Sequence, residues 1–564
     1  MTTGADSAVL LAALEGLGER VRDLSLPLAV TDLAAAQRLR REIADQLDDY
    51  LLPRLRRTDA PMLAVVGGPT GAGKSTLVNS LVGERVSAAG VLRPTTRSAI
   101  LAYHPADNAW FENRRVLGSL GRTTGASADP ANLQLVPSSS MPVGLAVLDA
   151  PDIDSVVVAN RELATQLLAA ADMWLFVTSA SRYADFVPWE FLRAAATRGT
   201  AVAIVLDRVA FEAVDEVRAH LATMLTEQGL GGAPLFVVPE TTPVDSLLPP
   251  GSVDIIRQWL LGLAADPTVR AAVVHHTLHG TLRALVGRVV LLAAASDAQA
   301  EVAAQLRRQV DQAYDDGLAR VDDATGNGSL LRGEVLARWQ EFVDTGEMMR
   351  ALESKSGRLR DRVTAAVHGK ARPGDALAEA LEYGVEALVR AVADEAAERA
   401  GAAWQDDPAG SALMGGEDDL RRSSRELPET AREAIREWQD AVLELVRKQG
   451  QGKRATARYL AFGVHGLGLL LMVVVFARAD ELAEGEVAGA GRASALSRRI
   501  LVAVLGDKAV RSLVASSRAD LHRRVAYLLN TERGRFLSRL DAVAISDDAG
   551  AALRAAVQDV EDTR

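Results

Sequence analysis

The pattern of hydrophobic positions changes near residue 268. Between residues 60 and 265, short apolar runs alternate with longer segments of helical character, which is typical of strands and helices in alternation. The runs expected as strands are 62–68, Gly144–Leu148, Met173–Thr178, Ala201–Leu206 and Leu235–Val238. The helices expected between them are Ala159–Ala170, Trp189–Ala196 and Ala210–Gln228. This order predicts an α/β domain with a doubly wound, mostly parallel sheet.

After residue 268 the strand signals stop and a helical stripe begins. Apolar side chains recur at i, i+4 at Val302, Leu306, Val310 and Tyr314, as on one face of a helix. Amphipathic segments continue to about residue 450 and resume at 498–560, and residues 8–58 indicate one or two further helices. The pattern predicts an extended all-α stalk or bundle after the α/β domain.

The chain is too long for one compact core, so we expect several domains. The expected divisions are N-terminal helices that pack with the stalk or neck (1–59), the α/β domain (60–265), a helical stalk (266–450), a hydrophobic membrane-interacting segment (451–497) and C-terminal helices that return to the bundle (498–564).

One hydrophobic segment, Tyr459–Ala477, has no formally charged residue. As a helix it would span roughly 28 Å, slightly less than a bilayer core. It is preceded by a cluster of basic residues, Arg447, Lys448, Lys453, Arg454 and Arg458, and followed by acidic ones. This asymmetry indicates contact with membrane lipid at the cytoplasmic face of the cell membrane. A single span, a hairpin or paddle, and a buried helix of the bundle remain alternatives.

Composition limits the partners. Lys and Arg number 63 and Asp and Glu 74, a formal net charge of −11. A globally acidic chain is a poor candidate for nucleic-acid binding, so we expect no nucleic-acid partner. The absence of cysteine excludes disulfides and thiolate chemistry and favours a reducing compartment. The first residues lack the basic region of a secretory signal, so we expect none there.

The run from Gly68 to Ser75, GPTGAGKS, matches the phosphate-binding P-loop pattern G-x-x-x-x-G-K-[ST] and lies between an expected strand and an expected helix. Glycines let successive backbone N–H groups curl around a phosphate, and the helix presents its positive end to the same group. The residues expected to bind the nucleotide here are Gly68, Thr70, Gly71, Ala72, Gly73, Lys74, Ser75 and Thr76. Lys74 would reach the β- and γ-phosphates.

A Mg²⁺ ion at a P-loop needs further oxygen ligands. Ser75 supplies one hydroxyl, and Asp149 ends an apolar strand, LAVLD, where a magnesium carboxylate is expected. A hydroxyl on a mobile loop would sense the γ-phosphate through Mg²⁺, and Thr95 or Thr96 lies at a suitable distance from Lys74 in the sequence. The expected metal ligands are therefore Ser75, Thr95 and Asp149, and the expected catalytic residues are Lys74, Thr95, Thr96 and Asp149.

The order STLVNSLVG, RPTT, VLDAPD, ADMWLFVTSA and AVAIVLDR resembles the GTPase domain of bacterial dynamin-like proteins, in the translation-factor-type class and especially its actinobacterial members with a late hydrophobic segment. The resemblance covers the GTPase domain through motifs and the helical remainder through architecture alone. It implies GTP and Mg²⁺ as cofactors, GTP hydrolysis, a switch transmitted through a helical stalk, and self-association or pairing with a second dynamin-like protein. The resemblance also implies that Asp152, Asp207 and Arg208 bind the nucleotide.

Three positions depart from the family pattern. The guanine-reading motif Asn/Thr-Lys-x-Asp is replaced by Asp207-Arg208-Val209-Ala210, so the carboxylate that would pair with guanine is missing at Ala210. Asp152 stands where a switch glycine is expected, and Gly71 stands where dynamins have a water-organising serine. GTP is the favoured nucleotide and ATP the alternative.

We therefore expect a GTPase, with slow hydrolysis, that couples nucleotide-dependent switch changes through the stalk to membrane binding or remodelling. The alternatives are a nucleotide-dependent regulatory scaffold and an ATPase that docks on a membrane complex.

Overall fold

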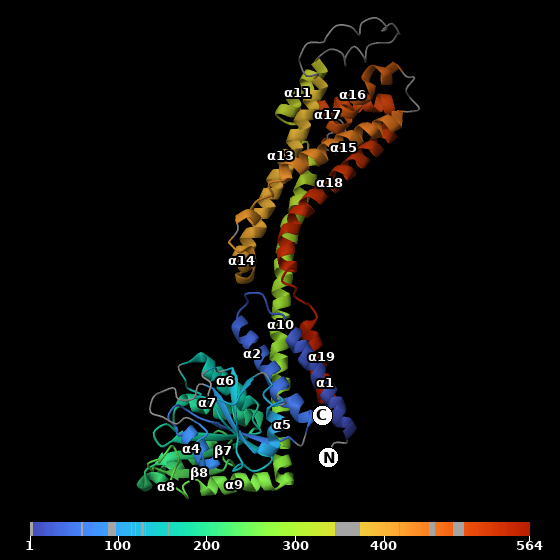
Figure 1. Cartoon of the computed structure of the whole chain (residues 1–564). Coiled ribbons are helices and arrows are strands. Elements are labelled where there is room, and N and C mark those ends of the chain that lie inside the picture. The colour runs from blue at the N-terminus through green and yellow to red at the C-terminus, as the bar shows by residue number, and fades with distance from the viewer. Residues whose placement is uncertain are drawn as a thin grey trace. The chain divides into compact units, whose positions relative to one another are not determined.

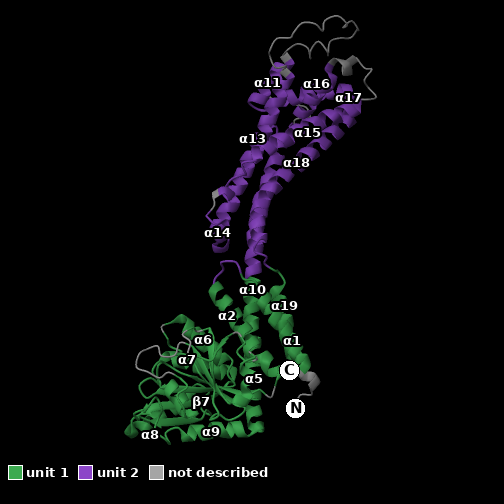
Figure 2. Cartoon of the chain, viewed as in Figure 1, with its two compact units in different colours: residues 1–26, 32–298, 546–564 green, residues 27–31, 299–545 purple. Residues whose placement is uncertain are grey.

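The structure is a computed structural model and divides into two compact units. Unit 1 comprises residues 1–26, 32–298 and 546–564, and unit 2 comprises residues 27–31 and 299–545 (Figure 2). The residues that the structure describes are 4–57, 60–87, 98–113, 116–118, 120–125, 129, 131–155, 157–344, 373–416, 418–450, 457–477 and 490–563.

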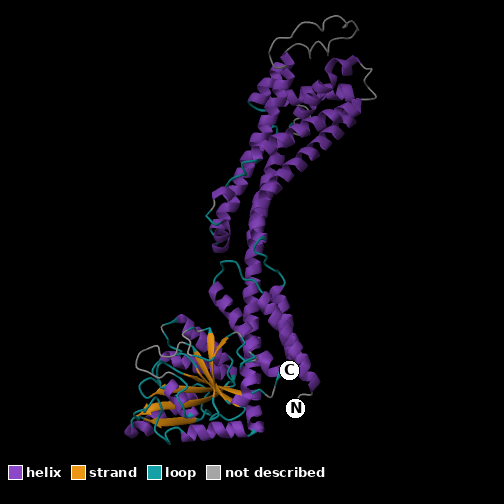
Figure 3. Ribbon diagram, viewed as in Figure 1, coloured by secondary structure: helices purple, strands orange, loops and turns teal. Residues whose placement is uncertain are grey.

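All described strands belong to unit 1 and form one eight-stranded sheet (Figure 3). The strands are β1 (Met62–Gly67), β2 (Ala99–Tyr103), β3 (Gly121–Thr123), β4 (Asn132–Pro137), β5 (Leu145–Asp149), β6 (Met173–Ser179), β7 (Ala201–Val209) and β8 (Leu235–Pro239). Their order is β3-β4-β2-β5-β1-β6-β7-β8. Strands β2 and β5 pair antiparallel, and every other pair is parallel. The predicted mostly parallel α/β sheet is confirmed.

The five strands expected from apolar runs are present, and β2, β3 and β4 were missed. Strand β3 has only three residues, none of them fully buried. Strand β4 buries alternate residues, so it lacks the continuous apolar run that marks the central strands. Both features weaken the local signal of a strand.

Helices cover both faces of the sheet. Side chains of β1 alternate between the faces: Met62, Ala64 and Val66 belong to one buried cluster, and Leu63 and Val65 belong to the other. The first face packs against α4 (Lys74–Val82), α9 (Asp254–Ala265) and the start of α10 (Pro267–Gly326). The second packs against α6 (Val158–Ala169), α7 (Phe186–Arg198) and α8 (Val214–Glu227). A short helix, α5 (Asn108–Phe111), follows β2.

A further core in unit 1 joins the N-terminal helices to the first half of α10 and to α19 (Ala549–Asp562). The N-terminal elements are α1 (Gly4–Asp23), α2 (Leu33–Gln46), the π-helical turn Leu47–Leu51 and α3 (Leu52–Arg56). Arg54 of α3 forms a buried ion pair with Asp172, the residue before β6. The N-terminal helices are therefore integral to the unit that holds the sheet.

The described part of unit 2 is helical (Figure 1). Its helices, apart from the second half of α10, are α11 (Glu334–Asp344), α13 (Pro373–Gln405), α14 (Pro408–Met414), α15 (Leu427–Gly450), α16 (Ala457–Val475), α17 (Ala490–Leu505) and α18 (Asp507–Asp541). Helices α13 and α18 have 33 and 35 residues, so each extends about 50 Å. Among the expected C-terminal helices of 498–564, α17 and α18 lie in unit 2 and α19 lies in unit 1.

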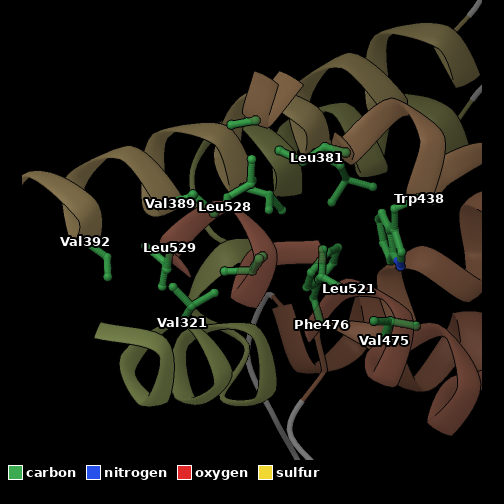
Figure 4. Packing of buried hydrophobic residues seen from close by; sticks show 14 of the residues in the cluster. Val321, Leu381, Val389, Val392, Trp438, Val475, Phe476, Leu521, Leu528 and Leu529 are labelled. Carbon is green, nitrogen blue, oxygen red and sulfur yellow. The ribbon is translucent and has the colours of Figure 1, made fainter. Parts of the chain in front are cut away.

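The second part of the hydrophobic helix α16, from Leu467 onward, lies inside the core of unit 2. From Leu469 to Ala477 each side chain is at most 1% exposed. Phe476 packs against Trp438 of α15 with ring centroids 5.5 Å apart (Figure 4). A residue with non-helical backbone, Gly463 (φ 65°), kinks the helix. Of the three alternatives for Tyr459–Ala477, this structure therefore shows the buried helix for most of the segment.

Helix length bears on the membrane question. Within the described residues, the apolar helical stretch Phe462–Val475 is shorter than the ~20 residues that cross a bilayer. Helix α10 is the one described helix that is long and apolar enough for a span, a test that buried core helices also meet. Lys453 and Arg454 of the basic cluster lie outside the described residues.

Candidate nucleotide-binding site

The glycine-rich run with the P-loop pattern, Gly68–Ser75, connects β1 to α4, as predicted. Three of its glycines have positive φ, at 153° for Gly68, 75° for Gly71 and 94° for Gly73. A Cβ atom on Gly68 would lie 2.0 Å from the carbonyl oxygen of Val177, and one on Gly73 would lie 2.1 Å from Asp207 Oδ2. The close approach to β6 and β7 explains why glycine is needed at both places.

The loop's other residues extend it into α4. Ala72 is fully buried, and its N–H donates to Pro69 O at 3.2 Å. Thr76 lies in the first turn of α4, where its carbonyl accepts a hydrogen bond from Ser80 Oγ at 2.7 Å. The helix thus begins at Lys74, with its N-terminal end at the loop, as an anion-binding turn requires.

Lys74 lies in the loop with its side chain only 5% exposed. Its ammonium donates to Gly68 O at 3.0 Å and to Pro69 O at 3.1 Å, and it forms an ion pair with Asp152. An ammonium has three N–H donors, so these three acceptors saturate it. In this structure Lys74 is therefore bound by two carbonyls of the loop and by an acid of the same chain.

Asp149 ends β5 beside the P-loop and is fully buried. Its Oδ2 accepts hydrogen bonds from Ser75 Oγ at 2.7 Å and from Ser87 Oγ at 2.6 Å. Burial raises the pKa of Asp149, against the opposing effects of the two serine hydrogen bonds and of Lys74. Its Oδ1 is buried and accepts no hydrogen bond from any described residue.

An orphaned carboxylate oxygen next to a serine hydroxyl fits the oxygen ligands that Mg²⁺ prefers. Ser75 and Asp149, two of the predicted metal ligands, lie in contact. Ser87 was missed by sequence reasoning, since nothing in its neighbourhood marks it. It is positioned by Asn79, whose Oδ1 accepts the N–H groups of Val86 and Ser87 at 2.9 and 2.8 Å. Thr95 and Thr96 lie outside the described residues.

A second pair of residues, Asp154 and Arg182, braces the P-loop and was also missed. Asp154 Oδ1 accepts the N–H and the hydroxyl of Thr70 at 2.6 and 2.7 Å. Arg182, which follows β6, bonds Asp154 Oδ2 at 2.7 Å and donates to Thr70 O at 2.7 Å. Burial acts to raise the pKa of Asp154, but the bonds from Thr70 and the charge of Arg182 outweigh it and lower that pKa. The sequence signal that could have pointed to Asp154 is the segment DAPDID, residues 149–154, which has three acids in six residues.

The base end of the site lies at the carboxyl end of β7. Asp207 is 6% exposed and lies against Gly73, and burial raises its pKa to about 6, although Arg208 opposes the shift. Its Oδ1 is buried without a hydrogen-bond partner among the described residues. Arg208 has a left-handed backbone (φ 56°), and its Nε lies 3.7 Å from Asp207 Oδ2. Ala210 is exposed and offers no carboxylate for a guanine.

Comparisons with known proteins give little beyond this geometry. The chain matches no family model and no curated protein. Two solved structures of an oligomerised bacterial dynamin pair, described as a mechanism for long-range sensing and tethering of membranes, are similar to it. One has 12% identity and a TM-score of 0.28 over 98% of this chain and 83% of that chain. The other has 8% identity and a TM-score of 0.37 over 100% and 96%. TM-scores this low carry no argument about function.

Proposed function

We propose that the chain is a dynamin-like, Mg²⁺-dependent GTPase whose helical unit couples nucleotide state to membrane binding or remodelling. The observation that carries the nucleotide part is the loop at Gly68–Ser75, with Lys74 directed into it and the orphaned Oδ1 of Asp149 beside Ser75. Ser75 and Asp149, with Thr95 as the third expected ligand, would hold Mg²⁺. When bound, that ion supplies positive charge to the β- and γ-phosphates.

The identity of the base is the less specified part of the proposal. Asp207 and Arg208 lie at the base end, and the aliphatic stem of Arg208 can cover one face of a purine. The missing carboxylate at Ala210 favours ATP as the second candidate. We retain GTP because the order of motifs along the chain resembles the bacterial dynamin-like GTPase domain.

The membrane part of the proposal requires α16 to leave its present environment. Nine large apolar side chains are at most 1% exposed: Leu467, Leu469, Leu470, Leu471, Met472, Val473, Val474, Val475 and Phe476. Moving them into water would cost roughly 15–25 kcal/mol as an upper bound, more than the total stability of most domains. Contact of these nine side chains with lipid therefore requires their direct transfer from the core into an apolar bilayer.

We further propose that the chain acts at the cytoplasmic face of a membrane, with a second copy or a paired dynamin-like protein as its partner. A regulatory scaffold with weak hydrolysis and an ATPase that docks on a membrane complex remain the competing functions. Measuring how much membrane binding changes with nucleotide distinguishes the regulatory scaffold from the proposed function. Measuring which nucleotide is preferred distinguishes the ATPase from it.

The nucleotide assay compares fluorescent mant-GTP and mant-ATP binding in the wild type and in Lys74→Ala. We expect tighter binding of mant-GTP and a loss of at least tenfold in Lys74→Ala, because the lysine supplies the charge at the phosphates. Asp215→Asn, an exposed acid in the first turn of α8, is the control for a change of one charge. Equal affinity of wild type and Lys74→Ala would contradict the site.

Because the chain has no cysteine, single dye labels can test membrane contact without a background. His465 of α16 is about half exposed, and Tyr527 of α18 is 72% exposed. We expect an environment-sensitive dye at His465→Cys to shift to the blue with anionic liposomes and GTP, and the same dye at Tyr527→Cys to stay unchanged. No shift at His465 in any nucleotide state would reject contact between α16 and lipid.

A further inference from the structure

Asp152 differs in its contacts from the other two acids at the carboxyl end of β5, Asp149 and Asp154. Asp149 is bound by Ser75 and Ser87, and Asp154 is bound by Thr70 and Arg182. Asp152 contacts the ammonium of Lys74, and its side chain is 16% exposed. It is thus the acid of this segment that meets both the phosphate-binding lysine and solvent.

The contact with Lys74 sets the distance from Asp152 to a bound phosphate. Two acceptors that share one ammonium at ~2.8 Å each lie about 4.6 Å apart at a tetrahedral angle. When a γ-phosphate oxygen replaces one of the carbonyl acceptors of Lys74, the carboxylate of Asp152 remains at about this distance from it. A water on the side away from the ammonium can hydrogen-bond to both oxygens at this separation, and attack requires it to lie about 3–3.5 Å from phosphorus.

Among the described residues, Gly71 and the other two acids at the carboxyl end of β5 are not available for this water. Gly71, at the position where a water-organising side chain is expected, has no side chain. Asp149 Oδ2 is occupied by two serine hydroxyls, and its free oxygen is the one that fits a metal. Asp154 faces Thr70 and the guanidinium of Arg182. Among the described residues of the loop after β5, Asp152 is left as the carboxylate for the water.

We propose that Asp152 is a catalytic residue that orients the attacking water and accepts its proton, an inference that rests on the proposed nucleotide hydrolysis. The water oxygen forms a bond to the γ-phosphorus, and the bond from that phosphorus to the bridging β-phosphate oxygen breaks. The electron pair of the broken bond stays on the bridging oxygen, which leaves with the diphosphate. The proton leaves the water for Asp152 and passes from there to solvent, so the products are nucleoside diphosphate and inorganic phosphate.

The same position makes Asp152 unfavourable for binding, since its negative charge lies close to the phosphates and competes with them for Lys74. A catalytic role and a binding penalty in one side chain produce an unusual signature. Removing the charge is expected to tighten nucleotide binding and to slow hydrolysis. A side chain that merely supports the loop would weaken both.

The test is single-turnover hydrolysis of γ-labelled GTP and ATP, with mant-nucleotide affinity measured on the same samples of the full chain. In Asp152→Asn we expect the hydrolysis rate to fall about 100-fold or more, while affinity rises about tenfold. Asp152→Glu, which keeps the carboxylate, should restore part of the rate. Asp215→Asn serves as the control and should behave as the wild type, and thermal melting shows whether each variant is folded.

Several results would overturn this role. Hydrolysis within threefold of the wild type in folded Asp152→Asn would reject it, whether affinity rises or not. A rise in affinity with an unchanged rate would show that Asp152 only competes for Lys74. A wild type that binds nucleotide through Lys74 but never hydrolyses it would reject both the proposed GTPase activity and this step. If the wild type hydrolyses nucleotide and folded Asp152→Asn does not, the proposed GTPase activity and the role of Asp152 are both supported.

Discussion

Arg518 of α18 holds the carboxyl end of the hydrophobic helix α16 in the core of unit 2. Its Nε donates to Val475 O at 2.8 Å, and its Nη2 donates to Ala477 O at 2.7 Å. Val475 is the last residue of α16 and Ala477 lies two residues beyond it, so both carbonyls are at the carboxyl end of the helix, where intrahelical donors are missing and a positive charge is favourable. Burial removes part of the hydration of the guanidinium and so lowers the pKa of Arg518.

The size of this contribution follows from the two contacts. Each hydrogen bond from a charged donor contributes about 1.5–3 kcal/mol, and the lost hydration of the guanidinium offsets part of the sum. We expect Arg518→Met, which keeps the aliphatic stem but removes the donors, to reduce the free energy that holds α16 in place by about 2–4 kcal/mol. At ~1.4 kcal/mol per factor of ten, this corresponds to an increase of roughly 30- to 1,000-fold in the population of open α16.

Hydrogen exchange measures that population directly, because exchange of buried amides reports local opening. Peptides that cover 462–477 should exchange faster by this factor in Arg518→Met, while peptides of the sheet in unit 1 stay unchanged. Arg511→Met is the matched control, since Arg511 of the same helix forms an exposed pair with Asp507 at 3.0 Å, which contributes little. If α16 is the lipid-binding segment, flotation with anionic liposomes should also rise.

Two results would refute this reasoning. Unchanged exchange in 462–477 would show that the two carbonyl contacts do not hold the helix. Faster exchange over all of unit 2 would show that α16 opens only when the whole unit unfolds, in which case it cannot pass to a membrane by itself. Faster exchange in α16 without any gain in flotation would support the buried-helix alternative over a membrane role.

Three further predictions concern unit 1. Because burial raises the pKa of Asp207 to about 6 from an unfolded value near 3.9, its contribution to stability is present below about pH 4 and is lost as the pH rises through 6. Asp207→Asn should therefore be more stable than the wild type by about 2–3 kcal/mol at pH 7.5 and no more stable near pH 4, as urea unfolding at the two pH values would show; an equal difference at both contradicts this. Arg54→Met leaves the buried Asp172 without its charged partner and removes hydrogen bonds to Ala60 O and Pro61 O, so it should cost about 3–5 kcal/mol, with most of the loss recovered when Asp172→Asn is added; no recovery would mean that the backbone contacts or packing, not charge, explain the loss. Gly68→Ala places a Cβ 2.0 Å from a backbone oxygen of β6, so we expect a lower melting temperature and loss of mant-nucleotide binding, and wild-type behaviour would show that the loop adapts.

Much of this protein is determined by local sequence. The P-loop needs glycines, a lysine and a serine within eight residues, so its pattern identifies both its place and its neighbours β1 and α4. Strands β1, β5 and β6 are buried on both faces, and their apolar runs are visible in the sequence, whereas β2 is equally buried and was missed. The end of β5 at Asp149 follows from the same run. Helical periodicity likewise predicts the all-α character of the remainder.

Tertiary structure decided the rest, because it depends on which residues meet across the chain. Asp152 reaches Lys74, and Asp154 reaches Thr70, only because β5 and β1 are adjacent in the sheet. Ser87 meets Asp149 through a loop held by Asn79, which no spacing rule anticipates. The hydrophobic pattern of α16 is equally compatible with a bilayer and with a core, since both remove apolar side chains from water. Only the packing of α15 and α18 against this helix shows that, in this structure, its apolar side chains are buried in the core of unit 2.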